Sequence, residues 1–189
     1  MITRTDETSR RIYARVAGFT FIFYIVAGMT SLALPDGSGL AAVLPLLTSL
    51  SAVVLGVTLY ALTVEQGPAL ALLALACRVV EAVSGEAAFF FAVGSLIFCW
   101  LLLRGRMIPA ALAWLGIVAS ALLVLILPMQ SAGLLGGATT WSASVTWIMW
   151  MPMLVFELTL ALWLIIKGVN VDGRNLAAGS GLASQKATT

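Results

Sequence analysis

The chain has no histidine and only two cysteines among its 189 residues. Without an imidazole it lacks the commonest side-chain ligand of zinc, haem iron and copper, and the only side chain that ordinarily titrates near neutral pH. Both cysteines, Cys77 and Cys99, fall in apolar segments. We interpret them as buried reduced thiols, while a disulfide between them stays open at this point. We therefore expect no metal and no cofactor.

Charge is also scarce, because charged residues make up 10% of the chain and hydrophobic residues 61%. Soluble domains carry about 25% charged residues, so this composition excludes a water-soluble protein. The net charge of +2 is too small to indicate nucleic-acid binding. We find no nucleophile–base pair, no Walker loop and no cluster with metal-ligand spacing, and we expect no enzyme.

The apolar residues are grouped in six segments, which predicts an all-α bundle of transmembrane helices. A spanning helix needs roughly 20 apolar residues to cross about 30 Å of hydrocarbon, so the chain has room for little else. Residues 1–15 form a basic segment that we expect in the cytoplasm, and residues 168–189 a disordered cytoplasmic tail. The expected spans are 16–34, 40–64, 69–83, 87–103, 107–128 and 141–166.

The division between the third and fourth spans decides the topology. A single helix over 69–103 would be about 50 Å long, far more than the hydrocarbon width. With two spans there, nine basic residues share one side of the membrane, the cytoplasmic side by the positive-inside rule. They are Arg4, Arg10, Arg11, Arg15, Arg104, Arg106, Lys167, Arg174 and Lys186. We predict a multi-pass protein of the bacterial inner membrane with both termini in the cytoplasm.

Three charged residues lie inside the predicted spans: Arg78, Glu81 and Glu157. Each charge near midspan costs about 2.5–3.5 kcal/mol of insertion free energy, so Arg78 and Glu81 together outweigh the roughly 2–4 kcal/mol that the Leu and Val residues of the third span return. Arg78 shares a helix face with small residues such as Ala71 and Ala74, so we expect it to point into the bundle. Glu81 follows at i+3, within reach of an intrahelical pair, and we expect that Glu157 can approach Arg78 from the sixth span.

Weaker patterns surround these charges. Pro152 interrupts the backbone ladder before Glu157, as in the broken helices of transporter sites. Tyr24 lies on a mildly polar stripe of the first span, for which helix packing is the default interpretation. Thr48 could line a cavity or bond to its own backbone. Met149, Met151 and Met153 alternate, which favours core filling over a copper relay.

Four stretches together resemble a bacterial family of small polytopic membrane proteins, domain of unknown function 4386. The stretches are residues 14–28, 77–85, 101–119 and 156–170. The resemblance carries Arg78, Glu81 and Glu157 as positions that match the family's motif residues. It implies no substrate, reaction or cofactor. The short connection between the third and fourth spans departs from the family.

Two interpretations of the charged residues remain open. In the first, the protein is a small transporter or an ion- or proton-coupled permease that binds its substrate or ion at Arg78, Glu81 and Glu157. In the second, it is a structural, assembly or lipid-interacting membrane protein in which these charges only fix helix packing. The expected partners are the lipid bilayer and, for a transporter, a small-molecule or ion ligand. Formation of a homo-oligomer stays open.

Overall fold

The computed structural model describes residues 4–34, 39–84, 87–134 and 144–169, and these residues are helical with no strand among them. This confirms the all-α prediction. A single 3-10 turn, η1, follows the second helix. The elements are α1 (Arg4–Ala33), α2 (Gly39–Thr63), η1 (Val64–Gln66), α3 (Pro68–Val83), α4 (Ala87–Arg104), α5 (Ala110–Ser131) and α6 (Ser144–Ile166).

Within the described part of the chain, five helices, all except α3, are long and apolar enough to cross a membrane. Large apolar side chains cover the outside of the bundle, among them Phe19, Leu46, Val118 and Ile148, each at least 60% exposed. Water would penalise such a surface, whereas lipid does not. The chain is therefore a multi-pass membrane protein. With 16 residues, α3 is about 24 Å long, shorter than the hydrocarbon core.

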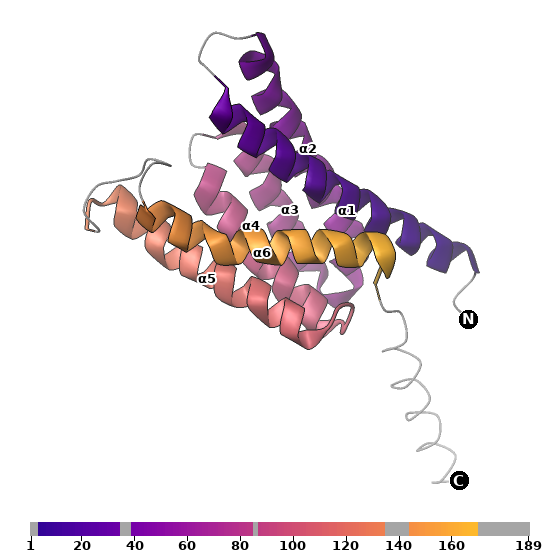
Figure 1. Cartoon of the computed structure of the whole chain (residues 1–189). Coiled ribbons are helices and arrows are strands. Elements are labelled where there is room, and N and C mark those ends of the chain that lie inside the picture. Colours follow the sequence, from indigo (N-terminus) through magenta and orange to yellow (C-terminus); the bar gives the residue numbers. More distant parts are fainter. Residues whose placement is uncertain (1–3, 35–38, 85–86, 135–143, 170–189) are drawn as a thin grey trace, which may run out of the picture.

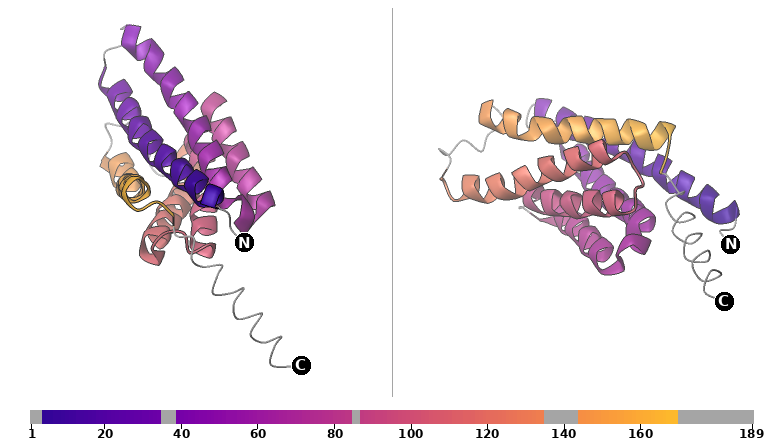
Figure 2. Two further views of the ribbon diagram at one scale, coloured as in Figure 1. Left: turned by 90° about the vertical axis from the view of Figure 1, so that its right-hand side faces the viewer. Right: turned by 90° about the horizontal axis from the view of Figure 1, so that it is seen from below.

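The six helices form a closed ring. Each helix packs against its neighbours in the sequence, and α6 returns to pack against α1. Figures 1 and 2 show α1 and α2 as one pair and α5 and α6 as another, with α3 and α4 between them. Because the ring closes through α1 and α6, side chains from helices far apart in the sequence meet in its interior.

The ring is tight at one end and open at the other. Midway along α1 and near the end of α6, a Cβ atom at Gly18 would lie 2.8 Å from the backbone oxygen of Ala161. Toward the other end of the bundle, where α1 ends and α6 begins, the two helices diverge (Figure 1). Residues from both diverging ends line a cavity.

Two glycines let α3 approach its neighbours. A Cβ atom at Gly56 of α2 would lie 2.9 Å from the Cβ of Arg78, and one at Gly94 of α4 would lie 3.1 Å from the Cβ of Cys77. The α3 face that contains Ala71 and Ala74 is buried, as the pattern of small residues predicts. Arg78 is thus held between two helix backbones.

Helix ends differ from the predicted span ends where polar residues or prolines occur. Helix α1 begins at Arg4 and not at residue 16. The polar residues before Val16 continue the same helix beyond the apolar span. Helix α5 begins after Pro109, not at 107, since a residue that precedes proline disfavours the helical region. It also passes the predicted end at Pro128 and stops near Gly133, which has a left-handed φ of 72°.

Two other predictions lie partly outside the described residues: the start of the sixth span at 141–143 and the tail at 170–189.

The cysteines are both buried and free, so the open alternative of a disulfide is excluded. No group of three or more Cys, Asp or Glu side chains that could hold a metal ion occurs among the residues that the structure describes.

Candidate functional site

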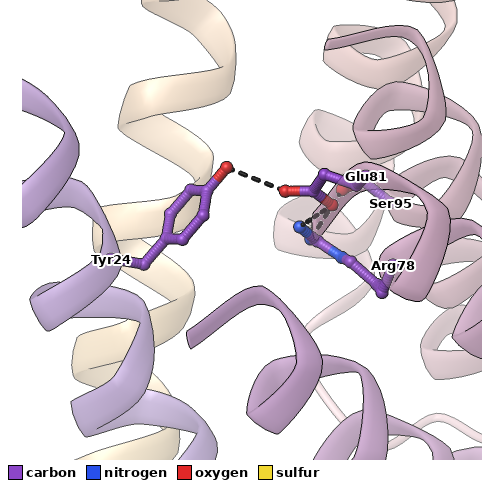
Figure 3. A network of polar contacts seen from close by, with 4 residues as sticks. All are labelled: Tyr24, Arg78, Glu81 and Ser95. Atoms are coloured by element: carbon purple, nitrogen blue, oxygen red, sulfur yellow. Dashed lines mark hydrogen bonds and ion pairs between the residues drawn. The ribbon is translucent and has the colours of Figure 1, made fainter. Parts of the chain in front are cut away.

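Arg78 lies at the centre of a network that joins three helices (Figure 3). Its Nη1 donates a hydrogen bond of 2.9 Å to Oε2 of Glu81, and its Nη2 donates one of 3.0 Å to Oγ of Ser95 on α4. The hydroxyl of Tyr24 on α1 donates a hydrogen bond of 2.8 Å to the other carboxylate oxygen, Oε1 of Glu81. The predicted i+3 pair of Arg78 and Glu81 is therefore formed, and both side chains are almost completely buried.

Aromatic rings complete the surroundings of the guanidinium. Its central carbon lies 4.7 Å from the ring centroid of Phe91 on α4, a distance typical of a cation–π contact. The same Phe91 ring is parallel to that of Tyr24, at a centroid distance of 6.4 Å, and is tilted against Trp150 of α6 at 5.7 Å. These contacts extend the network from α3 to all the helices around the interior except α2 and α5.

Glu157 is buried, but it stands apart from the pair. Within the described residues it forms no ion pair with Arg78, and its Oε1 is buried without a hydrogen-bond partner. The expected approach of Glu157 to Arg78 is thus not a direct contact: Arg78 pairs with Glu81, and Phe91 of α4 lies against the guanidinium and lines the same cavity as Glu157. Arg78 still acts on Glu157 electrostatically at longer range, and so does Glu81. The three predicted residues form one closed pair and one separate acid.

The open end of the ring contains a cavity of about 300 Å³ that reaches Glu157. Its wall is formed mainly by α1, α4 and α6. At the inner end lie the buried side chains of Phe91, Met153 and Glu157, while exposed residues such as Leu32 and Met151 lie at its opening. The lining is largely apolar and aromatic, with one carboxylate.

A second cavity, of about 260 Å³, lies on the other side of Tyr24. It is lined by Glu81 and by hydroxyl side chains that include Thr48 and Ser49. The hydroxyl of Thr48 also donates a hydrogen bond of 2.9 Å to the carbonyl of Leu44, so both functions considered for this residue occur. Tyr24 lines both cavities, as do Gly28, Thr48 and Ala87, so the cavity of Glu81 adjoins that of Glu157.

Pro152 lies inside α6, one turn before Glu157. Since proline has no N–H, the carbonyl of Ile148 loses its helical partner at this point. Pro152 does not line the cavity of Glu157; it lines a shallow apolar depression with Leu115 and Ile148 on the outside of the bundle. Among the methionines of α6, Met149 and Met153 are buried, as expected for core filling, while Met151 is 43% exposed.

The structure adds three residues that the sequence did not mark as site residues: Tyr24, Ser95 and Phe91. Tyr24 was interpreted only as a packing residue, and the hydroxyl stripe to which it belongs was the available signal. Ser95 and Phe91 carry no such signal, because their roles depend on how α3 and α4 are placed side by side. A buried Arg does require several acceptors, so a search for hydroxyl groups in adjacent spans would have included Ser95.

Tyr24→Phe should lower stability without changing the fold. The substitution leaves Oε1 of Glu81 buried with one donor fewer, which we expect to cost about 1–2 kcal/mol of unfolding free energy. The measurement is thermal or SDS-induced unfolding of the purified protein in detergent. Tyr13→Phe is the matched control because Tyr13 is 42% exposed on the same helix. Equal stability of the two variants would show that the hydrogen bond to Glu81 is not significant.

The family comparison covers the second half of the bundle. Residues 85–168 match the family model described as a domain of unknown function, DUF4386. This confirms the resemblance predicted from the sequence. The matched residues include Phe91, Ser95 and Glu157, while Tyr24, Arg78 and Glu81 lie outside the DUF4386 match. No curated protein and no solved structure matches the chain.

Proposed function

We propose that this membrane protein is a small permease of the bacterial inner membrane, in which Glu157 binds an ion, a proton or a small molecule. The observation that carries the proposal is a buried carboxylate with an unpartnered oxygen at the inner end of a cavity. An ionised carboxylate in lipid is costly unless it is paired, and such residues mark substrate and ion pathways. Since the available cation, Arg78, is bound to Glu81, Glu157 remains available for a ligand.

The form of the cavity supports transport. It opens at the end of the bundle where α1 ends and α6 begins, and the close contact between Gly18 and Ala161 closes the opposite end. A site near mid-membrane with access from one side at a time is what alternating access requires. Pro152 weakens the backbone ladder of α6 one turn from Glu157, which favours bending of the helix that borders the site.

We further propose that α3 also crosses the membrane, which gives six spans and places both termini in the cytoplasm. Gly18, midway along α1, lies against Ile165 at the end of α6, and Arg10 in the first part of α1 forms an ion pair with Glu65 after α2, so these three helix segments share one end of the bundle. Ends on the same side require an even number of crossings, so α3 must be added to the five long helices. The described basic residues other than Arg78 then gather at the cytoplasmic end.

The alternative, in which buried charges only fix helix packing, is favoured for Arg78 and Glu81. Their charges neutralise each other, and Ser95, Tyr24 and Phe91 contact the pair, while Nε of Arg78 is buried without a hydrogen-bond partner. A pair of this kind aligns α1, α3 and α4, and the guanidinium charge is already compensated by Glu81. Within the permease we therefore assign a structural role to the pair and the binding role to Glu157. We propose no enzymatic activity.

Replacement of Glu157 tests the proposal. Wild-type protein reconstituted in liposomes and adsorbed on a solid-supported membrane should give a transient charge displacement after a pH jump, because the cavity exposes Glu157 to one side. Glu157→Gln should abolish this signal, while size-exclusion profile and unfolding temperature stay near those of the wild type. Glu65→Gln is the matched control, since it makes the same chemical change at an exposed residue far from the cavity.

An unchanged charge displacement in folded Glu157→Gln protein would refute the binding role. If this variant does not fold, labelling of the wild type decides the question. The hydrophobic carbodiimide dicyclohexylcarbodiimide reaches carboxyl groups from lipid, and mass spectrometry should find the adduct on Glu157 and none on Glu81, which is engaged by Arg78 and Tyr24. Absence of an adduct on Glu157 would contradict an accessible site.

A further inference from the structure

The cavity beside Glu157 differs in chemistry from the usual site for a small inorganic ion. A hydrated metal ion needs several oxygen ligands, but this cavity offers one carboxylate among apolar and aromatic groups. Its volume of about 300 Å³ lies at the lower end of the range for organic ligands. The occupant should therefore be an organic molecule with a large apolar surface.

The charge of the interior determines the charge of the occupant. Arg78 and Glu81 neutralise each other, so an ionised Glu157 leaves the interior with one uncompensated negative charge. The other titratable groups that act on or near Glu157 are Tyr24 on α1 and Cys99 on α4, and neither supplies a positive charge. A monovalent cation in the cavity would pair with this carboxylate in a medium of low dielectric constant.

Aromatic rings around the carboxylate favour a cation whose charge is spread over an apolar body. Tyr24, Phe91, Trp147 and Trp150 all line the cavity together with Glu157. The faces of such rings attract ammonium and related cations, and Trp does so most strongly. Phe91 already contacts the guanidinium of Arg78, so this aromatic wall holds one cation in the structure itself.

The opening of the cavity indicates how the ligand enters. Helices α1 and α6 diverge at this end (Figure 1), and the exposed residues at the opening are apolar: Met29, Leu32, Trp147 and Met151. These side chains belong to the surface that faces lipid. A molecule that partitions into the bilayer can pass between α1 and α6, whereas a strongly hydrated solute would lose its water without compensation.

We propose that the cavity binds a lipophilic organic cation, with the Glu157 carboxylate as counter-ion and Trp150, Trp147 and Tyr24 as an aromatic wall. This inference rests on the proposed function, because it names the substrate class of the same site. The ligand enters laterally from the membrane between α1 and α6. Transport of such a cation needs no chemical change in it, and Glu157 releases it when its charge is neutralised.

The test uses tetraphenylphosphonium as the cationic probe and triphenylphosphine oxide as a neutral molecule of similar shape. Equilibrium binding to the purified full chain should be saturable for the cation and absent or much weaker for the neutral compound. Glu157→Gln should weaken binding of the cation at least about tenfold. Trp150→Leu should weaken it about fivefold through the lost cation–π contact, and Trp114→Leu, on an exposed face of α5, should change nothing.

A second variant keeps the test decisive if Glu157→Gln does not fold. Gly28 lines the cavity, and a Cβ atom there would meet no other atom within 4 Å. Gly28→Leu should therefore fold normally, fill the cavity and abolish saturable binding of tetraphenylphosphonium. Binding that survives in this variant would place the cation elsewhere on the protein and overturn the inference.

The outcome also separates the two proposals. If the wild type binds neither probe but keeps the charge displacement that depends on Glu157, the substrate class is wrong and the permease proposal stands. If both probes bind equally well and Glu157→Gln changes neither affinity, binding is simple hydrophobic partition and the cation inference fails. Loss of both the charge displacement and the cation binding in the wild type would refute the two proposals together.

Discussion

Arg78→Met should reduce the yield of folded protein severely, although it removes the most costly residue from α3. On an insertion scale the change is favourable, since an Arg near midspan costs about 2.5–3.5 kcal/mol. In the folded bundle, however, it leaves Glu81 buried with a single hydrogen-bond donor, Tyr24. Loss of one partner of a buried ion pair costs about 3–5 kcal/mol. Protein stabilities lie at about 5–15 kcal/mol, so the packing effect decides the outcome.

The double variant Arg78→Met/Glu81→Met distinguishes a structural pair from a functional one. Replacing both charges removes the uncompensated carboxylate, and hydrophobic substitutes for a buried pair are often neutral or stabilising. We expect the double variant to recover most of the folded protein in size-exclusion chromatography and in SDS-induced unfolding. Arg104→Met serves as the control, because Arg104 is exposed at the end of α4. Undiminished stability of Arg78→Met alone would contradict the network in Figure 3.

The sequence predicted the burial of Arg78 because the information is local. Ala71 and Ala74 lie on the same helix face, and Glu81 lies one turn further, so a single helix specifies both the burial and the pair. The six apolar segments were also local features, since each is a continuous run of residues. The ends of the helices do not follow from hydropathy in the same way. Hydropathy marks where the chain enters the hydrocarbon, whereas α1 and α5 begin and end at other residues.

The relation between Arg78 and Glu157 could not be predicted in the same way. Their separation depends on which helices pack against α3, and the closed ring places α2 and α4 beside it and α6 on the opposite side of the ring. Only this arrangement brings Tyr24 to Glu81, across 57 residues of sequence. Hydropathy predicts which side of each helix faces lipid and which faces protein. It does not predict which helices pack against each other. For that reason the sequence identified the acid that forms the candidate site but not the aromatic wall around it.

Gly116→Val should destabilise the bundle and disturb the site at the same time. A Cβ atom at Gly116 of α5 would lie 2.5 Å from Cε2 of Phe156 and 2.6 Å from Sγ of Cys99, and both of these side chains are buried. An aromatic ring fixed between helices cannot move aside cheaply, so α5 must separate from α4, from α6 or from both. Overpacking of this kind costs about 1–3 kcal/mol for one or two added carbons, and a branched side chain should cost at least the upper value.

The consequence for function follows from the position of Phe156. It precedes Glu157 on α6, so a shift of its ring moves the backbone that holds the carboxylate in the cavity. We expect Gly116→Val to lower the unfolding temperature and to weaken tetraphenylphosphonium binding, and Gly116→Ala to do both to a smaller degree. Gly28→Ala is the control for stability, since the added Cβ would meet no atom beyond the local helix backbone within 4 Å and alanine favours the helix. If Gly116→Val and Gly28→Ala unfold at the same temperature, α4, α5 and α6 are not packed as closely as described, and the support for Glu157 lies elsewhere.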